Sequence, residues 1–248
     1  MSTLVLLRHG QSDWNRDKRF QGWTDVGLTS RGEQQAAAVG RVLAQEGYRF
    51  DACFTSRLRR ATESLALVLR AMGQEQTPTH QCWRLNERHY GALQGLRRWE
   101  AVRKYGVIRM IRWQREFATA PPPVALDDPR HPSNDPRYVD LDTALLPSSE
   151  SLADTLERIL PYWYDAIVPA LATGKQVLVV AHHNTLRALL KHLEHIPPRA
   201  MLRVRVPIAK PLVFELDSLQ RPLRRHYVEV LPAPTVSSHS PMRGGSNA

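Results

Sequence analysis

The chain has 248 residues, of which 42% are hydrophobic and 23% are charged, and this composition excludes a fibrous, repetitive or largely disordered protein. No stretch approaches the roughly 18 consecutive apolar residues that a membrane-spanning helix needs, and no basic segment precedes the short apolar run at the N-terminus. We therefore expect no membrane partner and no export signal. The net charge of +10 favours anionic partners without choosing among metabolites, nucleic acid and lipid headgroups.

The first predicted element is a buried strand over residues 3–7, which are apolar without alternation, and the polar residues 8–15 follow it directly. Ser30 and Glu33 have the spacing of a capping box ahead of an Ala-rich helix over residues 34–45, with Gly47 placed to end it.

A second strand is expected over residues 51–55, with Ser56 as the N-cap of the helix that follows. That helix would carry Arg57, Arg59 and Arg60 in its first turns, where cations oppose the helix dipole unless an anion binds there. Residues 85–95 are predicted to form a polar, glycine-punctuated loop, and residues 120–147, rich in Pro, Asp and Asn, a surface insertion.

Alternating elements continue in the second half. Ser151 is placed to cap a long helix through residue 171, broken or offset at Pro161 and Pro169. Strands are expected over residues 176–181, 212–216 and 226–231, with a helix over residues 185–193. This order predicts an α/β three-layer sandwich, in which a mainly parallel sheet is covered by helices on both faces. We expect one domain over residues 1–231, with an insertion at about 96–147, and a flexible tail over residues 232–248.

Two strands each end in histidine within a polar turn, at His9 and at His182, and a parallel sheet would bring both ends to one edge. Arg8, Arg57 and Arg60 offer forked donors for a phosphate, and an imidazole is a competent nucleophile when its other nitrogen donates to a fixed acceptor. Glu87 could supply the proton for a leaving oxygen.

Each of these residues also has an ordinary structural interpretation. A single histidine at a strand end is more often structural than catalytic, and a Glu in a loop is usually a solvated surface group. His182 and His183 point in different directions as neighbours and have no third ligand at a known spacing, so no metal is expected. The two cysteines, Cys53 and Cys82, form no disulfide framework, which favours a reducing, cytoplasmic setting.

Several segments together resemble the histidine phosphatase superfamily and, within it, the phosphoglycerate mutases that depend on 2,3-bisphosphoglycerate. The likeness runs from about residue 4 to about residue 227 and rests on LVLLRHGQSDWN, RFQGWTDVGLT, TSRLRRA, LNERHYGALQGL, DPRY and AHHNTLRALLKHL. The segment LNERHYGALQGL and the length of the insertion after it point to the mutase branch.

The resemblance implies that His9 is phosphorylated, that Arg8, Arg60 and His182 bind the transferring phosphoryl group, and that Glu87 is the general acid and base. It implies 2,3-bisphosphoglycerate as cofactor, no metal, a small phosphorylated metabolite as substrate and a homodimer or homotetramer, in glycolysis and gluconeogenesis. The substrate-binding residues that it implies are Asn15, Gln21, Gly22, Arg88, Tyr90, Arg98, Arg115, His183 and Asn184.

The chain departs from the family pattern at positions that would hold substrate. Arg98 replaces a lysine, which exchanges a compact ammonium for a planar fork. Gln114 removes one cation of a paired-arginine element, and His183 replaces a glycine. Gln21 replaces a small hydroxyl residue and Lys210 enters a turn, while the tail lacks the family's lysine-rich segment. The chemistry is therefore better specified than the substrate.

Two other functions stay open at this point. Water could resolve phosphorylated His9, which would make the protein a phosphatase on another phosphomonoester. A scaffold that binds nucleic acid is suggested by residues 97–115, which hold seven basic residues and one acid. We do not expect nucleic acid as the partner, because that function would leave the aligned catalytic residues unexplained.

Overall fold

The computed structural model describes residues 1–172 and 174–230 of the chain. Its sheet has six strands in the order β3-β2-β4-β1-β5-β6. Strands β1 to β4 are mutually parallel, β5 runs antiparallel to β1, and β6 runs antiparallel to β5. The bounds are Ser2–Arg8 for β1, Ala52–Thr55 for β2, Thr79–Gln81 for β3, Gln176–Ala181 for β4, Leu212–Leu216 for β5 and Pro222–Tyr227 for β6.

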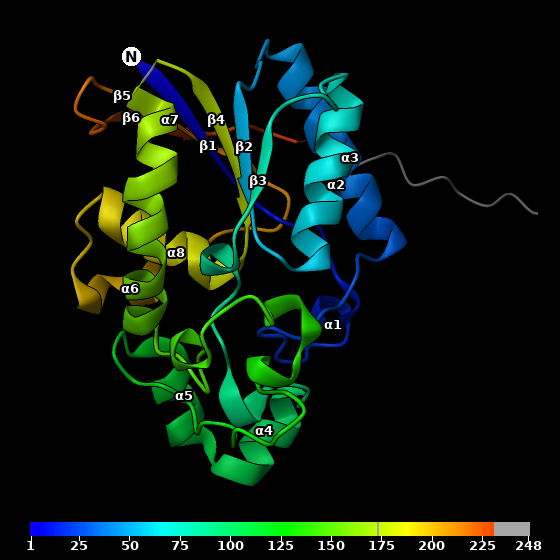
Figure 1. Cartoon of the computed structure of the whole chain (residues 1–248), viewed down its shortest axis with the longest axis vertical. Coiled ribbons are helices and arrows are strands. Elements are labelled where there is room, and N and C mark those ends of the chain that lie inside the picture. Colours follow the sequence, from blue (N-terminus) through cyan, green and yellow to red (C-terminus); the bar gives the residue numbers. More distant parts are fainter. Residues whose placement is uncertain (173, 231–248) are drawn as a thin grey trace, which may run out of the picture.

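Helices cover both faces of this sheet (Figure 1). Because side chains alternate along a strand, Leu4 and Leu6 of β1 lie on one face and Val5 and Leu7 on the other. The first face packs against α6 (Leu152–Tyr162), α7 (Val168–Ala172) and α8 (His183–Leu193), and the second against α2 (Ser30–Gln45) and α3 (Arg59–Met72). The predicted three-layer α/β sandwich is confirmed.

A further group of helices lies beyond the carboxyl ends of the parallel strands, in the lower part of Figure 1. It contains α4 (Arg98–Tyr105) and α5 (Val107–Arg115), while the short α1 (Asp13–Arg16) follows β1. Residues 120–147 form three 3₁₀ turns, but the prediction that they lie on the surface is wrong in part. Val124, His131, Tyr138 and Leu146 are buried, and Tyr138 and Leu146 pack with Trp23 and Trp83 in a small separate core.

Two predicted N-caps are wrong by one or more residues. Helix α2 begins at Ser30 with Thr29 as its cap, because the Thr29 hydroxyl accepts from the Gly32 amide. Helix α3 begins at Arg59, and its cap residue, Leu58, makes no side-chain bond. The hydroxyl of Ser56 instead accepts from the Leu58 amide in the turn before the helix. The expected cap at Ser151 is confirmed by a capping box with Asp154.

The predictions for the last elements need two further corrections. Helix α6 continues past Pro161, and the irregularity is a π-helical turn over Trp163–Ile167 that leads into α7. The last strand is β6, not residues 226–231, because a tight turn after β5, in which the Asp217 amide donates to the Arg221 carbonyl, starts the antiparallel pairing at Pro222. The tail predicted for residues 232–248 lies outside the described residues. No described helix is long and apolar enough to cross a membrane.

Candidate active site

The two histidines predicted to meet do so at the carboxyl ends of neighbouring strands. Strands β1 and β4 pair in parallel with Arg8 opposite Ala181, so that His9 and His182 follow at the same level. The His9 amide donates to the Ala181 carbonyl at 3.1 Å, and the two imidazole centroids are 5.1 Å apart. The sheet register therefore places two buried imidazoles side by side.

The ring of His9 has a defined proton. Its Nδ1 lies 2.7 Å from the Gly10 carbonyl oxygen, and since a carbonyl only accepts, Nδ1 carries the hydrogen and Nε2 is left with a lone pair. Burial, together with Arg60 and Arg8, holds the pKa of His9 well below its usual value. The ring is neutral at neutral pH, which is the form that attacks phosphorus.

The loop that presents His9 is anchored by a close backbone approach. The Gly10 amide donates to the Ser64 hydroxyl of α3 at 2.9 Å. A Cβ atom at Gly10 would lie 2.3 Å from the Gly32 carbonyl oxygen at the start of α2. Glycine is required here because the carbonyl that orients His9 sits on backbone pressed against α2.

Two guanidinium groups, those of the partly buried Arg8 and the buried Arg60, lie near the histidines without an ion-paired carboxylate. Arg8 donates to the Val206 carbonyl, and Arg60 donates to the carbonyls of Thr24 and Gly22. Within residues 1–172 and 174–230 neither forms an ion pair, and the Nε of each has no partner. Burial lowers the pKa of Arg60 to about 10, so this side chain stays charged at neutral pH. Two cations without a carboxylate partner favour the binding of an anion between them and the histidines.

His182 is held from behind by Ser56. The Ser56 hydroxyl lies 2.8 Å from His182 Nε2, while Nδ1 is buried and has no partner among the described residues. Burial and the neighbouring Arg60 keep the pKa of His182 well below its usual value. Nδ1 is therefore the ring atom left for a ligand, and Ser56 fixes the orientation of the ring.

Glu87 is only 7% exposed, so it is not the solvated surface group of the ordinary interpretation. Its Oε1 accepts from the amides of Arg88 and Asn184, at 2.9 and 3.0 Å. The Asn184 side chain in turn donates to the Tyr90 hydroxyl at 2.7 Å. The first turn of α8 thereby fixes both the carboxylate and the tyrosine.

These groups surround a pocket of about 110 Å³. Nine of the predicted site residues line it, namely Arg8, His9, Asn15, Gln21, Arg60, Glu87, Tyr90, Arg98 and His183. Four others lie one layer back. The ring of His182 lies beside His9, tilted by 56° to it, and the Gly22 carbonyl accepts from Arg60. The Asn184 side chain donates to Tyr90, and the Arg88 guanidinium lies 4.7 Å from the centre of the Tyr90 ring.

Arg115 is the predicted residue that the structure does not bring to the pocket lining. It is exposed at the end of α5, and Gln114 beside it is exposed as well. Arg57, proposed as a phosphate donor, instead pairs with Asp140 at 2.7 Å. Lys210 binds Glu229, away from the pocket, so only Arg98 among the altered cations faces the cavity.

The histidine that replaces a glycine of the family pattern, His183, stands at the first position of α8 and lines the pocket. Burial and the charges of Arg8, Arg187, Arg88 and Arg98 hold its pKa well below the usual value. His183 is therefore a neutral imidazole with several guanidinium groups near it.

Sequence reasoning missed four residues of the site. Arg19 and Phe20 line the pocket, Ser56 holds His182, and Arg187 donates to the Asn184 side chain at 2.9 Å. One signal was available for Arg187, since it lies one helical turn after His183 and Asn184 on α8 and shares their face. Nothing in the spacing of Ser56 distinguishes it from an ordinary helix cap.

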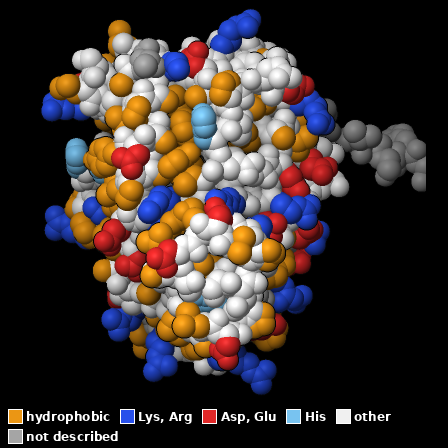
Figure 2. All heavy atoms as spheres, viewed as in Figure 1, with side chains coloured by type: hydrophobic (Ala, Val, Ile, Leu, Met, Phe, Trp, Pro, Cys, Tyr) orange, Lys and Arg blue, Asp and Glu red, His pale blue; other side chains and the backbone are white. Residues whose placement is uncertain are grey.

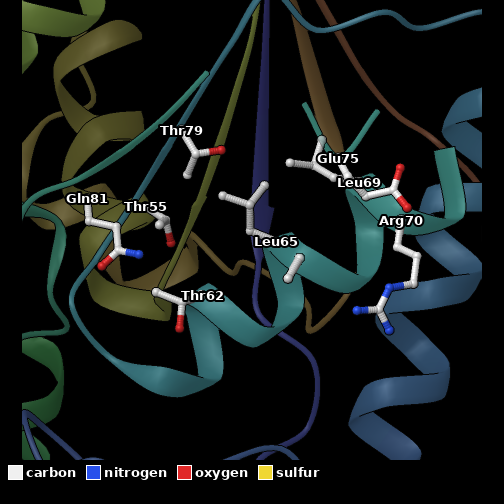
Figure 3. Close-up of a pocket in the computed structure, with 9 residues that line it drawn as sticks. Thr55, Thr62, Leu65, Leu69, Arg70, Glu75, Thr79 and Gln81 are labelled. Atoms are coloured by element: carbon white, nitrogen blue, oxygen red, sulfur yellow. The ribbon is translucent and has the colours of Figure 1, made fainter. Parts of the chain in front are cut away.

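A second, larger pocket of about 340 Å³ lies between α3 and strands β2 and β3 (Figure 3). Its polar lining includes Thr62, Thr79, Gln81, Arg70 and Glu75. None of its lining residues is a histidine, and its lining holds one guanidinium and one carboxylate. Of the two pockets, the smaller one around His9 is the candidate active site, because its lining combines two histidines, a buried carboxylate and two arginines, Arg8 and Arg60, that form no ion pair among the described residues.

In the described part of the chain no group of three or more His, Cys, Asp or Glu side chains could hold a metal ion. Lys and Arg side chains are spread over the face shown in Figure 2 and form no single continuous patch there. That distribution offers no defined track for nucleic acid on this face.

Comparisons with known proteins agree with this geometry. Residues 4–131 and 127–228 match the histidine phosphatase superfamily (branch 1). A 2,3-bisphosphoglycerate-dependent phosphoglycerate mutase of Nitratidesulfovibrio vulgaris (strain Miyazaki F) is 50% identical over 228 residues, which cover 92% of each chain.

Solved structures share the fold. A mycobacterial glucosyl-3-phosphoglycerate phosphatase superposes with a TM-score of 0.69 at 24% identity, covering 94% of this chain and 100% of that one. Bacillus stearothermophilus YhfR superposes with a TM-score of 0.66 at 25% identity, covering 88% and 92%. The chain belongs to the histidine phosphatase superfamily and, within it, to the family of the 2,3-bisphosphoglycerate-dependent phosphoglycerate mutases.

Proposed function

We propose that the protein interconverts 3-phosphoglycerate and 2-phosphoglycerate through a phosphohistidine at His9. The observation that carries this proposal is the pocket itself, which is lined by a neutral, buried His9, by Glu87, and by Arg8 and Arg60, which form no ion pair among the described residues. The 50% identity to a curated mutase supports the same reaction.

The residues present fit 2,3-bisphosphoglycerate. The Nε–H groups of Arg8 and Arg60 are buried without partners, and phosphate oxygens accept from such donors. Nδ1 of His182, which also lacks a partner among the described residues, donates to a phosphate in the tautomer in which the Ser56 hydroxyl donates to Nε2. Arg8, Arg60 and His182 would hold one phosphate next to His9. Arg98, Tyr90, Asn15 and Arg19 line the rest of the pocket and would hold the other. When bound, 2,3-bisphosphoglycerate supplies the phosphoryl group that primes His9.

Nucleophilic attack falls to His9 Nε2. As the Nε2–phosphorus bond forms and the phosphorus–oxygen ester bond breaks, Arg8, Arg60 and His182 stabilise the charge that spreads over the equatorial oxygens. The Nδ1–H bond to Gly10 stabilises the positive charge that develops on the imidazole.

Proton transfer falls to Glu87. It gives a proton to the substrate oxygen that leaves phosphorus, and in the reverse direction it removes the proton of the hydroxyl that attacks phosphohistidine. The amides of Arg88 and Asn184 hold Oε1, so that Oε2 is left to face the substrate. Reorientation of the bound ligand between two such transfers moves the phosphate from one carbon to the next.

We further propose that the protein acts in the cytoplasm on a small phosphorylated metabolite, as a homodimer or homotetramer and without a metal. The free cysteines, Cys53 and Cys82, are in keeping with a reducing compartment. We also propose that residues 1–231 form one domain with an insertion at about 96–147. Arg115, which the family resemblance implies as a substrate contact, does not line the pocket, and its role in binding stays a proposal.

The deciding experiment is a coupled assay of 3-phosphoglycerate conversion, with and without added 2,3-bisphosphoglycerate, alongside release of inorganic phosphate. We expect conversion that depends on the bisphosphate, and none in the His9→Ala variant. Arg59→Met, which removes an exposed cation of α3, serves as the control with unchanged conversion. Absence of conversion in the unmodified, phosphohistidine-primed protein would refute the proposal.

A second function, hydrolysis of another phosphomonoester, is favoured by one observation. His183 adds bulk and a titratable group to the pocket where the family pattern has glycine. Phosphate release from a panel of phosphomonoesters, with negligible isomerisation, would establish this function and keep the same role for His9.

A further inference from the structure

Asn184 has an amide orientation that its neighbours dictate. Its Oδ1 lies 2.9 Å from NH1 of Arg187, and its Nδ2 lies 2.7 Å from the Tyr90 hydroxyl. A guanidinium has only donors, so the atom of Asn184 that faces Arg187 must be the oxygen. The amide nitrogen must then face Tyr90. Arg187 therefore determines which end of the Asn184 side-chain amide faces Tyr90.

The orientation of Asn184 decides what Tyr90 can do. Because the amide donates to the Tyr90 oxygen, the hydroxyl hydrogen of Tyr90 is not used in that bond. Among the described residues the hydroxyl has no other recorded partner, and Tyr90 lines the pocket. Its hydrogen is therefore free for an oxygen of the bound ligand.

The ring of Tyr90 is also fixed. Phe20 packs edge-on against it, with centroids 5.2 Å apart, and the Arg88 guanidinium lies 4.7 Å from its centre. These contacts fix the position of the hydroxyl oxygen. The direction of the hydroxyl hydrogen can still vary, and the side chain of Asn184 determines it.

Arg187 itself lies behind the pocket. It is buried, its NH2 donates to the Met201 carbonyl at 2.6 Å, and it does not line the cavity. It is one turn along α8 from Asn184. Arg187 contacts the side-chain amide of Asn184, which binds Tyr90, whereas Glu87 is held by the backbone amide of Asn184, which Arg187 does not contact.

We propose that Arg187 is a positioning residue for ligand binding: it fixes the Asn184 amide so that Tyr90 donates its hydroxyl hydrogen to the ligand. If Arg187 is absent, the amide can rotate by half a turn and present its oxygen to Tyr90. The tyrosine then donates to Asn184 and offers the ligand only lone pairs, which repel an anionic oxygen. The inference rests on the proposed function only for the identity of the ligand.

The test is a double-mutant cycle on the binding of 2,3-bisphosphoglycerate, measured by calorimetry on the full-length protein. Tyr90→Phe is expected to weaken binding about tenfold, the loss of one hydrogen bond to a charged group, which corresponds to about 1.4 kcal/mol. Arg187→Met is expected to weaken binding by a similar factor. In the Tyr90→Phe protein, Arg187→Met should weaken binding no more than about threefold further, because the Tyr90 hydroxyl hydrogen that Arg187 orients is already absent.

Two variants separate positioning from other effects. Arg187→Lys should recover most of the affinity, since an ammonium also offers only donors to the Asn184 oxygen. Arg41→Met, which removes an exposed cation from α2, should leave binding unchanged and so exclude a general effect of net charge. In turnover, Arg187→Met should raise KM about tenfold and leave kcat within about threefold, a split that general destabilisation would not produce.

Each outcome decides the matter. A non-additive cycle with recovery by lysine supports the inference, even if the protein shows no mutase turnover and the proposed function fails. Additive losses of about a hundredfold in the double variant would overturn it, because Arg187 would then act without Tyr90. Unchanged affinity in Tyr90→Phe would overturn it as well. Failure of the unmodified protein to bind 2,3-bisphosphoglycerate would overturn both proposals.

Discussion

Arg158 of α6 and Glu150 form a buried ion pair that supports the site, although neither residue lines the pocket. Their side chains are 6% and 3% exposed, and both nitrogens of the fork reach the carboxylate, at 2.5 and 2.9 Å. The same guanidinium donates to the carbonyls of residues 83, 84, 86 and 87. The pair therefore ties the segment that bears Glu87 to the helix layer.

Arg158→Met should destabilise the protein strongly. It leaves the Glu150 carboxylate buried with only the His89 amide as donor, and breaking a buried pair from one side costs about 3–5 kcal/mol. For a chain of this size each kcal/mol shifts Tm by about 2–4 °C, so Tm should fall by about 6–20 °C. Glu150→Gln in the Arg158→Met protein removes the stranded charge, and we expect it to restore part of the loss.

Urea unfolding followed by circular dichroism measures these differences. Arg59→Met is the matched control, because it breaks an ion pair whose arginine side chain is 62% exposed and should cost less than about 1 kcal/mol. A loss below about 1 kcal/mol in Arg158→Met would refute the reasoning. So would further destabilisation on adding Glu150→Gln, since the stranded carboxylate would then not be the source of the cost.

Three further predictions concern the site and its surroundings. Gly10→Ala should lower turnover at least tenfold and reduce Tm. The added Cβ would lie 2.3 Å from the Gly32 carbonyl oxygen and would displace the Gly10 carbonyl, which orients His9. Unchanged turnover and Tm would contradict this. Burial lowers the pKa of His89 to about 3. Below pH 6.5 the unfolded chain therefore binds a proton at His89 that the folded chain does not bind. The free energy of unfolding should then decrease as the pH falls from 6.5 towards 3. The loss is up to about 1.4 kcal/mol per pH unit, and the urea midpoint of His89→Gln should vary less over that range. Because the pKa of His183 is held low by burial and by four arginines that a bound bisphosphate would neutralise, ligand binding should take up a proton there. The affinity for 2,3-bisphosphoglycerate should therefore gain more between pH 8 and pH 6 in the unmodified protein than in His183→Gln, and equal gains in calorimetry would argue against this coupling.

The sheet and the proximity of His9 and His182 were predictable because they depend on local patterns. Continuous apolar runs followed by polar turns mark β1 and β4, and parallel pairing then places His9 and His182 together. The capping of α3 was not predictable, because Ser56 can cap a helix or orient a histidine and only the fold decides which. Strand β6 was misplaced because as an exposed edge strand it shows no hydrophobic alternation.

The supporting residues were beyond the reach of the sequence for a different reason. Arg158 and Glu150 read as ordinary charges eight residues apart, and their burial follows from how α6 packs over the segment before Tyr90. Arg187 belongs to a helix that was predicted, yet its partners Asn184 and Met201 are set by tertiary contacts. The residues proposed to contact substrate were predicted from the family resemblance, whereas the residues that hold them in place became apparent only from the tertiary structure.

The charge of the pocket bears on the choice between isomerisation and hydrolysis. Four guanidinium groups, those of Arg8, Arg19, Arg60 and Arg98, line it with the carboxylate of Glu87, and Arg19 also lies 4.0 Å from Glu100. One phosphate beside Arg8 and Arg60 would leave Arg98, which forms no ion pair among the described residues, for a second anionic group of the ligand. A second phosphate carries about −1.5 to −2 at neutral pH, more than a carboxylate, so we expect 2,3-bisphosphoglycerate to bind more tightly than 3-phosphoglycerate. Since isomerisation requires that the bisphosphate be retained between two transfers, such a difference in affinity would favour the mutase over the phosphatase.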